Sequence, residues 1–425
     1  MNDKMMSSLF LKRFSLLLVV IILTAATPMR KLSKKNLAYL YDRSDFTDVS
    51  WMVYHVSEKS SRIYGDISLK GMSYRHAWNN DGEARAKFQV TFHLLESYES
   101  KDIIDSSTMI FTDSLHFGTD LHVVISNDFH TPYKGDYLLK VLLTDMNNPE
   151  NNLMDYVHVY KSNRLSAQNF MITDENGNPI FQPVLEKEEK FVLKYNDPDR
   201  KELTVRYYNR EFPLAQTPFA LDRRETYTFK PDSLYTLELN NGISSLLEFP
   251  FRGIYFIQPD KEQPEGYTIF RFEDSFPTIN TTEKALRTLR YLTTEAEFNK
   301  LNSYQDQKMA IDSFWLDRAS NNPERARNMI KRYYNRVEFA NREFTSYHDG
   351  WKTDRGLVYI IYGPPSEVYR KTDEEEWIYG ERGNPLSIRF FFDKVENPFT
   401  QNDYSLQRSP VYKTSWYIAI ENWKR

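Results

Sequence analysis

The sequence contains no cysteine, and this absence removes several kinds of site. None of the 425 residues is a cysteine, which excludes disulfides, zinc–thiolate sites, cysteine nucleophiles and a lipid anchor on cysteine. The phosphate-binding loop, the dinucleotide-binding fingerprint and the His-Glu-x-x-His helix are missing as well. An exported chain without disulfides is held together by its apolar cores, and a chain of this length is expected to form several of them.

An excess of positive charge is also missing. The formal charge is −4, and it becomes −6 once residues 1–26 are removed, because that segment carries three basic residues and one acidic residue. A mildly acidic chain without a lysine- or arginine-rich block argues against nucleic-acid binding. From these absences we predict no catalytic residue, no metal site and no cofactor.

The N-terminus has the features of a secretory signal peptide. Lys4, Lys12 and Arg13 precede an uncharged apolar stretch at residues 14–23, and the small residues 24–26 offer a cleavage site. An apolar stretch of about ten residues is too short to span a bilayer, which takes about 20. We predict a signal peptide at 1–26, a linker at 27–44 and a periplasmic mature chain that is not a lipoprotein. The alternative is an uncleaved signal anchor, which would be the chain's only membrane contact.

Aromatic residues are abundant, at 15% of the chain. Residues 87–94 alternate between polar and apolar, and this period of two places Phe88, Val90, Phe92 and Leu94 on one buried strand face. Similar short runs recur up to about residue 257, and they predict two immunoglobulin-like β-sandwich modules, at 45–162 and 163–262. Exposed tyrosines can also bind glycans, so a glycan- or peptide-binding role stays open.

The pattern becomes helical after about residue 263. Thr282 can cap a helix through Leu286, Leu289 and Phe298. A second helix carries Ala310, Ile311, Phe314 and Trp315 on one face. Asn322 followed by Pro323 is a typical helix start. Four strands are expected after this third helix, at 357–362, 376–379, 387–392 and about 404–407. Helices followed by an antiparallel sheet predict an α+β domain at 263–425.

The densest motif of the chain lies at residues 349–365. It reads Asp-Gly-Trp-Lys-Thr-Asp-Arg-Gly at 349–356, continues with an apolar run, and ends at Gly363-Pro364-Pro365. It is preceded by Phe314-Trp315 and residues 333–337, and it is followed by Trp377-Ile378-Tyr379 and three phenylalanines at 390–392. This ordered set resembles the GWxTD-domain family of envelope proteins as found in Bacteroidota. The family has no established biochemical activity. The resemblance therefore implies an envelope location and a domain architecture, but no reaction.

The residue types of the motif favour a structural role. Gly350 and Gly356 are expected to adopt backbone conformations closed to other residues, and Trp351 is large enough to lock the turn against the preceding helix. Thr353 or Asp354 can accept hydrogen bonds from turn amides. Arg355 is expected to pair with Asp354, with Asp349 or with a helix terminus. Gly363, Pro364 and Pro365 are expected to end the predicted strand.

Two other interpretations of the motif remain. Trp351, Asp354 and Arg355 could form a ligand site with His348 beside them, or Asp354 and His348 could act as an acid–base pair. The acidic run at 373–376 is expected to be a solvated hairpin tip and not a calcium site, because it lacks spaced oxygen ligands.

These patterns lead to an expected function. We expect a non-enzymatic exported cell-envelope protein, in which two β-sandwich modules present a C-terminal GWxTD interaction domain to an unidentified envelope protein or glycan. A glycan- or peptide-binding protein is the alternative, and an enzyme acting on the cell wall or an exported polymer is the third possibility. The third requires Asp349, Asp354 and His348 to converge in one cleft.

Overall fold

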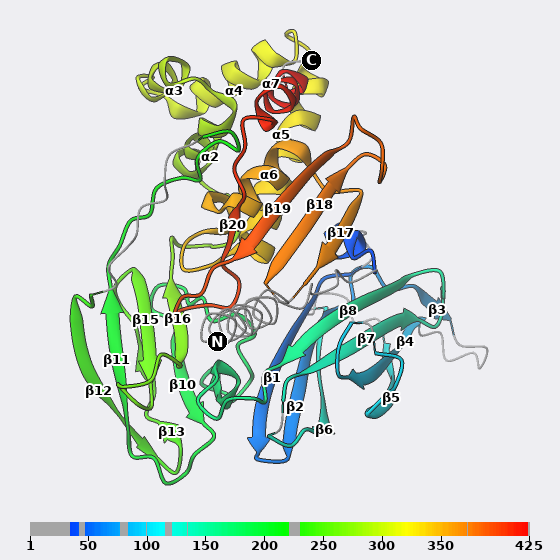
Figure 1. The fold of residues 1–425 in the computed structure, drawn as a ribbon, viewed down its shortest axis with the longest axis vertical. Helices are drawn as coiled ribbons and strands as arrows, with labels where there is room; N and C mark the ends of the chain where they lie inside the picture. Colours follow the sequence, from blue (N-terminus) through cyan, green and yellow to red (C-terminus); the bar gives the residue numbers. More distant parts are fainter. Residues whose placement is uncertain are drawn as a thin grey trace, which may run out of the picture.

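The computed structural model describes residues 35–41, 47–76, 84–98, 100–114, 121–133, 135–220, 230–371 and 373–423. The predicted signal peptide and a strand expected at 227–229 lie outside these residues. The described chain is mostly β, with several antiparallel sheets and a helical region towards the C-terminus (Figure 1). The predicted mostly β class is therefore confirmed. The immunoglobulin-like assignment and the domain limits stay predictions.

The first module consists of two sheets that share one core. One sheet has the order β1-β2-β6, and the other has the order β3-β4-β7-β8 with β5 on the far side of β4. Phe88, Val90, Phe92 and Leu94 of β4 are fully buried between the sheets, as their alternation predicted. The strands are β1 (Val49–Ser57), β2 (Ser60–Ser68), β3 (Tyr74–His76), β4 (Ala84–Leu95), β5 (Asp105–Ser114), β6 (His122–His130), β7 (Tyr137–Asp145) and β8 (Asn152–Val159).

The second module is one eight-stranded sheet of order β14-β10-β13-β12-β11-β15-β16, with β9 paired to β10. It curls around a core that includes Phe191, Val205 and Ile269. Strand β16 pairs with β15, so this sheet continues past position 262, where the second module was expected to end. The strands are β9 (Phe170–Thr173), β10 (Lys190–Tyr195), β11 (Glu202–Tyr208), β12 (Ser233–Asn240), β13 (Ile243–Ser244), β14 (Leu247–Glu248), β15 (Gly253–Gln258) and β16 (Tyr267–Arg271).

The helical region begins with a helix that is shorter than predicted. Helix α2 is capped by Thr281 instead of Thr282, and the chain then leaves the helical path, so the predicted single helix through Phe298 is wrong. A capping box of Thr294 and Glu297 starts the next helix. Asn322 caps α5 with Pro323 in its first turn, as predicted. The elements are α2 (Thr282–Thr288), η3 (Leu289–Leu292), α3 (Glu295–Asn302), α4 (Gln307–Arg318) and α5 (Pro323–Phe344).

The motif region forms a short turn, η4 (Gly350–Lys352), and a helix, α6 (Asp354–Tyr362). The strand predicted at 357–362 is therefore wrong. A short apolar run is compatible with a strand or with a helix buried on all sides. Every residue of α6 except the last, Tyr362, is buried, which explains why no polar face marks it as a helix.

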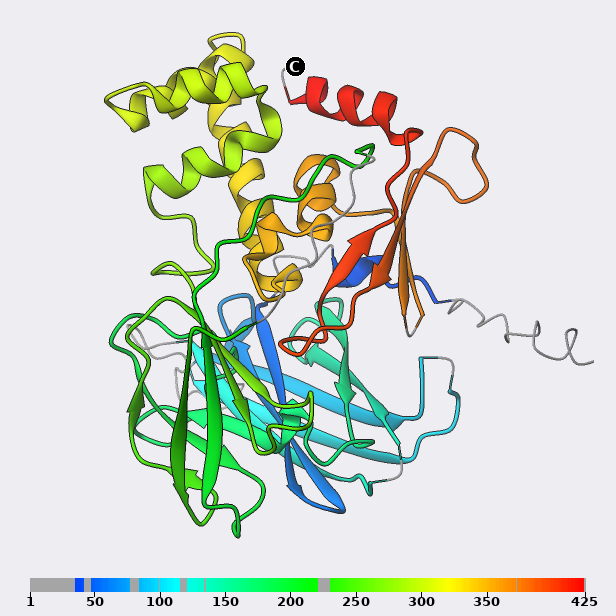
Figure 2. The ribbon, with the colours of Figure 1, turned by 60° about the vertical axis from the view of Figure 1, so that its left-hand side comes forward.

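The C-terminal sheet has the order β17-β18-β19-β20, and all of its pairs are antiparallel. Helices α5, α6 and α7 lie on one side of it (Figure 2) and share its core, which contains Trp377, Phe390 and Trp416. The elements are β17 (Glu367–Arg370), β18 (Glu374–Tyr379), β19 (Ile388–Lys394), β20 (Tyr404–Leu406) and α7 (Tyr412–Asn422). Neither β17 nor α7 was predicted from the sequence.

Residues 35–41, here called the N-terminal strap, were predicted as part of a linker, but they are docked. The amide of Leu37 donates to the carbonyl of Val368 in β17 at 2.8 Å. Leu37, Leu40 and Tyr41 are buried in the same core as the C-terminal sheet and helices. The core also includes Leu95, Leu138 and Tyr156 of the first module, so the strap connects that module to the C-terminal domain.

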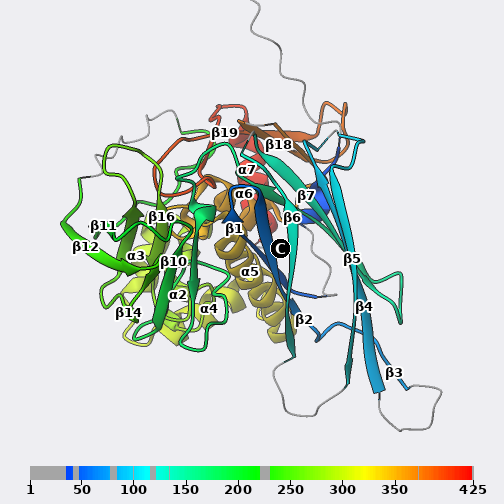
Figure 3. The same cartoon turned by 90° about the horizontal axis from the view of Figure 1, so that it is seen from below.

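The two β modules lie next to each other below the C-terminal domain (Figures 1 and 3). The second module packs on that domain through a small apolar cluster, in which Tyr208 and Phe256 contact the ring of Phe399. The first module is joined through the strap and the large C-terminal core. The C-terminal domain therefore has a separate apolar interface with each module.

Candidate functional site

The two glycines of the motif allow the backbone to pack closely. A Cβ on Gly350 would collide with the carbonyl oxygen of Ala340 in α5, and one on Gly356 would collide with the carbonyl oxygen of Gly350. Neither glycine has a positive φ. The expectation of a special backbone conformation is therefore wrong for both, and lack of space is the reason that only glycine fits. Segments η4, α5 and α6 consequently touch through their main chains.

Trp351 and Thr353 hold this turn in place. Trp351 is 6% exposed; its amide donates to Asn341 Oδ1 at 3.1 Å, and its carbonyl accepts from the Tyr291 hydroxyl at 3.0 Å. The Thr353 hydroxyl donates to the Gly350 carbonyl at 2.8 Å and accepts the Gly356 amide at 3.0 Å, which caps α6. The tryptophan thus packs the turn against α5, and the threonine sets the start of the next helix.

Asp354 is engaged inside the protein. Its carboxylate receives the guanidinium of Arg408 through both oxygens, at 2.6 and 3.1 Å, and the Leu406 amide at 2.8 Å. The residue is 1% exposed. It joins α6 to the segment that follows β20, and both of its carboxylate oxygens are bonded to these two partners.

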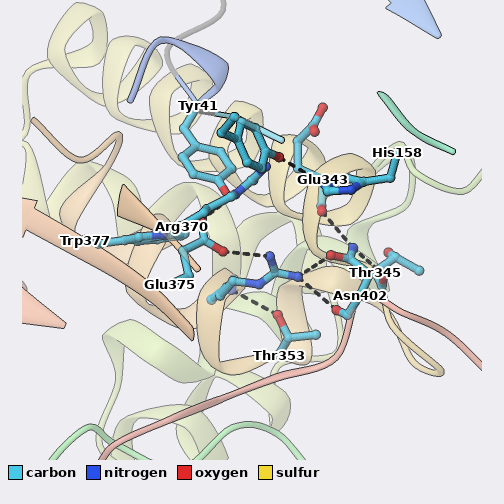
Figure 4. A network of polar contacts seen from close by, with 12 residues as sticks. Tyr41, His158, Glu343, Thr345, Thr353, Arg370, Glu375, Trp377 and Asn402 are labelled. Atoms are coloured by element: carbon cyan, nitrogen blue, oxygen red, sulfur yellow. Dashed lines mark hydrogen bonds and ion pairs between the residues drawn. The ribbon is translucent and has the colours of Figure 1, made fainter. Parts of the chain in front are cut away.

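Arg355 does not pair with Asp354 or Asp349, as was expected, but with Glu375 in β18. Its guanidinium donates to Glu375 Oε2 at 3.2 Å and to the Asn402 carbonyl at 2.9 Å, and it lies 4.1 Å from the centre of the Tyr404 ring. Both members of the ion pair are almost fully buried. Its two polar partners, Glu375 and Asn402, are labelled in Figure 4.

Glu375 is the centre of a buried polar cluster. Besides Arg355, it accepts from Arg370 Nε at 3.3 Å, from Trp377 Nε1 at 3.0 Å and from the hydroxyl of Tyr41 in the strap. Burial alone would raise the pKa of Glu375, but the charges of Arg370 and Arg355 hold it below its usual value. The cluster therefore keeps its carboxylate ionised and ties β17, β18, α6 and the strap together (Figure 4).

The acidic run at 373–376 is a solvated hairpin tip only in part: Asp373 is exposed in the turn between β17 and β18, but the end of the run is buried. Glu375 and Glu376 are 0% and 1% exposed and lie within β18. Glu376 accepts from Arg389 Nε at 2.6 Å. The carboxylates are paired with arginines on neighbouring elements, namely Arg355 of α6, Arg370 of β17 and Arg389 of β19. Among the described residues no group of three or more histidine or acidic side chains could hold a metal ion.

Gly363, Pro364 and Pro365 end helix α6, not a strand. Gly363 has φ +88°, a left-handed conformation that favours glycine, and its amide closes the helix on the Tyr359 carbonyl at 2.7 Å. The guanidinium of Arg336 lies against this glycine and donates to the carbonyls of Ile360 and Ile361. It therefore serves the last carbonyls of α6, and Pro364 and Pro365 prevent the helix from continuing.

His348 and Asp349 lie on a groove beside the motif, between the second module and the helices. The His348 ring packs near Tyr347 and Phe212, and Asp349 forms an ion pair with Lys352 at 2.6 Å. Of the nine motif residues from Gly350 to Pro365, all except the exposed Pro364 are buried, and they form two groups at the two ends of α6. The ligand-site interpretation of Trp351, Asp354 and Arg355 requires exposed groups, and these three side chains are buried.

A polar cleft of about 720 Å³ lies between the first module and the C-terminal sheet. Within the first module, the loop after β4, the start of β7 and the end of β8 supply aromatic and acidic groups. The strand ends of the C-terminal sheet supply Arg370, Lys371, Lys394 and Tyr404. The first module contributes Glu96, Tyr98, Asp136, His158 and Tyr160 to the lining.

The sequence analysis did not identify this cleft. Its residues come from separate segments of two modules, and Arg355 is the motif residue among them. The one available signal was the high aromatic content, which left a glycan- or peptide-binding role open. That interpretation asked whether aromatic side chains gather in an exposed groove at one end of a β module, and in this cleft they do.

Comparisons with known proteins add a family to this geometry. Residues 253–425 match the family model described as the GWxTD domain, and no curated protein matches the chain. A crystal structure of a mutant of Salmonella alpha-2-macroglobulin is similar over 50% of this chain and 16% of that chain, with 11% sequence identity and a TM-score of 0.16. Similarity at that level supports no conclusion about this protein.

Proposed function

Because residues 253–425 belong to the GWxTD domain family, we propose that this chain is a non-enzymatic, exported cell-envelope binding protein. In this proposal the GWxTD domain is a rigid scaffold, and the ligand binds in the cleft between that domain and the first module. The single observation that carries it is the contrast between a motif whose side chains are buried and bonded internally and a cleft lined by exposed rings and charges.

The architecture is consistent with a scaffold. We propose that the two β modules are immunoglobulin-like sandwiches and that helices α5 to α7 with sheet β17–β20 form an α+β domain. The strap and Glu375 fix the first module relative to this domain, so the two walls of the cleft are held at a set distance. A cleft with fixed walls loses little conformational freedom when a ligand binds.

The location is part of the proposal. The expected signal peptide directs the chain to the periplasm, where an unidentified envelope protein or glycan would be the partner. No helix among the described residues is long and apolar enough to cross a membrane. Cell fractionation tests this: recovery of the mature chain in the cytosol would overturn it, and membrane association resistant to carbonate would favour the uncleaved anchor.

Site-specific photo-crosslinking in intact cells tests the cleft. A photoreactive phenylalanine replaces Tyr98 in the cleft or, as the control, Tyr235, which is exposed on β12 of the second module. We expect a distinct adduct from position 98 and none from position 235 after illumination and purification. Absence of an adduct at 98, or the same adducts at both positions, would overturn the cleft as the binding site.

A further inference from the structure

One wall of the cleft is a row of aromatic rings from the first module. The rings of His158 and Tyr160 are stacked, with centres 5.7 Å apart and planes at 7°, and the ring of Tyr98 meets His158 edge-on at 5.7 Å. Tyr98 Oη and His158 Nε2 are hydrogen-bonded at 3.0 Å, which fixes their relative orientation. Such rings offer an apolar face with polar tips, and this combination suits the alternating C–H and hydroxyl surface of a sugar.

The opposite wall, from the C-terminal sheet, is positively charged. Arg370 and Lys394 both line the cleft; Arg370 shares Glu375 with Arg355, and the half-buried Lys394 lies near the charges of Glu396, Arg355 and Asp136. The His158 ring is accessible to solvent but lies inside the cleft, where burial, followed by the charges of Arg370 and Lys394, lowers its pKa to about 4. The two cations therefore act across the cleft, and they favour an anion there.

The acidic groups come from the first module, and Asp136 lies close enough to Lys394 for its charge to act on that lysine. Glu96 and Asp136 are exposed, and Asp136 uses one carboxylate oxygen to accept the Ser162 amide at 3.0 Å. Carboxylates are hydrogen-bond acceptors that suit sugar hydroxyls. A ligand with hydroxyls on one side and a negative charge on the other matches this arrangement.

A peptide ligand fits less well, because the backbone edge of β8 is closed where it enters the cleft. The Gln168 side chain accepts the Tyr160 amide at 2.8 Å and donates to the His158 carbonyl at 2.7 Å. These are the groups that an added strand would use to extend the sheet. Recognition here therefore depends on side chains.

We infer that the cleft binds an anionic saccharide, with the sugar faces on Tyr98, His158 and Tyr160 and the negative group beside Lys394 and Arg370. This inference rests on the proposed function, since it names the ligand class of the same cleft. The cleft volume falls within the range of about 300–1,000 Å³ that is usual for small-molecule sites, so one to three sugar units would fill it.

Calorimetric titration of the purified mature chain tests the ligand class with defined probes. These are trigalacturonic acid, neutral maltotriose and triglutamate. We expect trigalacturonic acid to bind, maltotriose to bind at least tenfold more weakly, and triglutamate to show no binding. Lys394→Gln should weaken trigalacturonic acid about tenfold, and Lys413→Gln on the exposed side of α7 should have no effect.

Tyr160 provides the second arm. Tyr160→Ala should abolish binding of trigalacturonic acid, and Tyr160→Phe should retain it because the ring is kept; circular dichroism checks that both variants are folded. Triglutamate binding as tightly as the trisaccharide, or maltotriose binding equally well, would overturn the inference. So would no binding of trigalacturonic acid at millimolar concentration. If crosslinking from position 98 still yields a specific adduct, the proposed function survives that failure; if neither occurs, both are wrong.

Discussion

The motif and the cleft lie close together in the C-terminal domain, but they differ in what their charged groups do. Asp354 and Arg355 of the motif are buried and bonded to Arg408 and Glu375. In the cleft, Lys394, Glu96 and Asp136 face solvent-accessible space. The most distinctive sequence in this chain therefore forms part of the interior of the C-terminal domain. The solvent-accessible charged groups of the cleft come from residues outside the motif. Variants in the motif should change stability, whereas variants in the cleft should change binding.

The largest expected effect is that of Trp351→Ala. Removing a buried tryptophan typically costs about 3–5 kcal/mol, a large share of the roughly 5–15 kcal/mol that stabilises a domain. Denaturant unfolding should show the C-terminal domain losing its cooperative transition or unfolding at much lower denaturant, while the second module stays folded. Phe251→Ala, at a residue 66% exposed, is the control and should change stability by less than about 0.5 kcal/mol. Wild-type unfolding of Trp351→Ala together with loss of function in cells would make the motif a binding site.

Glu375→Gln removes the carboxylate that compensates two buried guanidinium groups. Breaking a buried pair in this way costs about 3–5 kcal/mol. Glu374→Gln is the matched control, because its partner Lys371 lies nearer the surface and the expected cost is below about 1 kcal/mol. Equal stability of the two variants would mean that the cluster does not hold the domain together.

The same carboxylate predicts an acid limb in the stability of the domain. The pKa of Glu375 is lower in the folded chain than in the unfolded chain, where it is about 4.5. Its contribution is therefore present above about pH 4.5 and is lost as the pH falls through the lower folded value. Denaturant midpoints measured between pH 7 and pH 3 should fall less steeply for Glu375→Gln than for the wild type.

His55, in the first module, makes stability depend on pH over a different range. Its ring is fully buried and bonded to Ser61 and to the Tyr160 carbonyl, both at 2.9 Å. Burial lowers the pKa of His55 to about 4, so the unfolded chain takes up the proton first, and stability is lost as the pH falls from about 6.5 towards 4. The loss is on the order of 2–3 kcal/mol. His55→Gln should flatten the stability profile above pH 4.5, and the exposed control His130→Gln should leave it unchanged.

Asp354→Asn should have the smallest effect of the motif variants, about 1–3 kcal/mol, because a hydrogen-bonded charge is lost but the shape is kept. Asp312→Asn, in an exposed pair with Lys308, is the control. Thermal unfolding of both variants measures the role of the motif in stability, and crosslinking from position 98 in the same variants measures binding in the cleft. Loss of the adduct in a stable Asp354→Asn chain would contradict the structural role of the motif.

Much of the β architecture could be predicted, because one-sided burial produces a visible alternation, as in residues 87–94. Helix α6 could not, because α5, the C-terminal sheet and α7 enclose it and remove the polar stripe that marks a helix. Its valine, isoleucine and tyrosine residues then favour a strand by propensity. The tertiary environment decided the outcome against that propensity.

The candidate site was predicted in part. Sequence spacing identified the motif, but it attributed the need for its glycines to backbone angle instead of close packing. It also placed Glu375 and Glu376 in solvent, because no sequence pattern shows that Arg355, Arg370 and Arg389 pair with them in the folded domain. The cleft was out of reach for the same reason: its two walls meet only after both domains have folded.

The docked strap has a consequence for the order of assembly. Tyr41 bonds to Glu375 across a separation of 334 residues. Synthesis proceeds from the N-terminus, so residues 35–41 are made first, and their docking site in β17 and β18 is made only when the chain is nearly complete. Contacts between such distant segments form slowly because a very long loop must close. Until then Glu375 lacks one of its hydrogen-bond partners. In a chain truncated before β17, residues 35–41 would have no docking site.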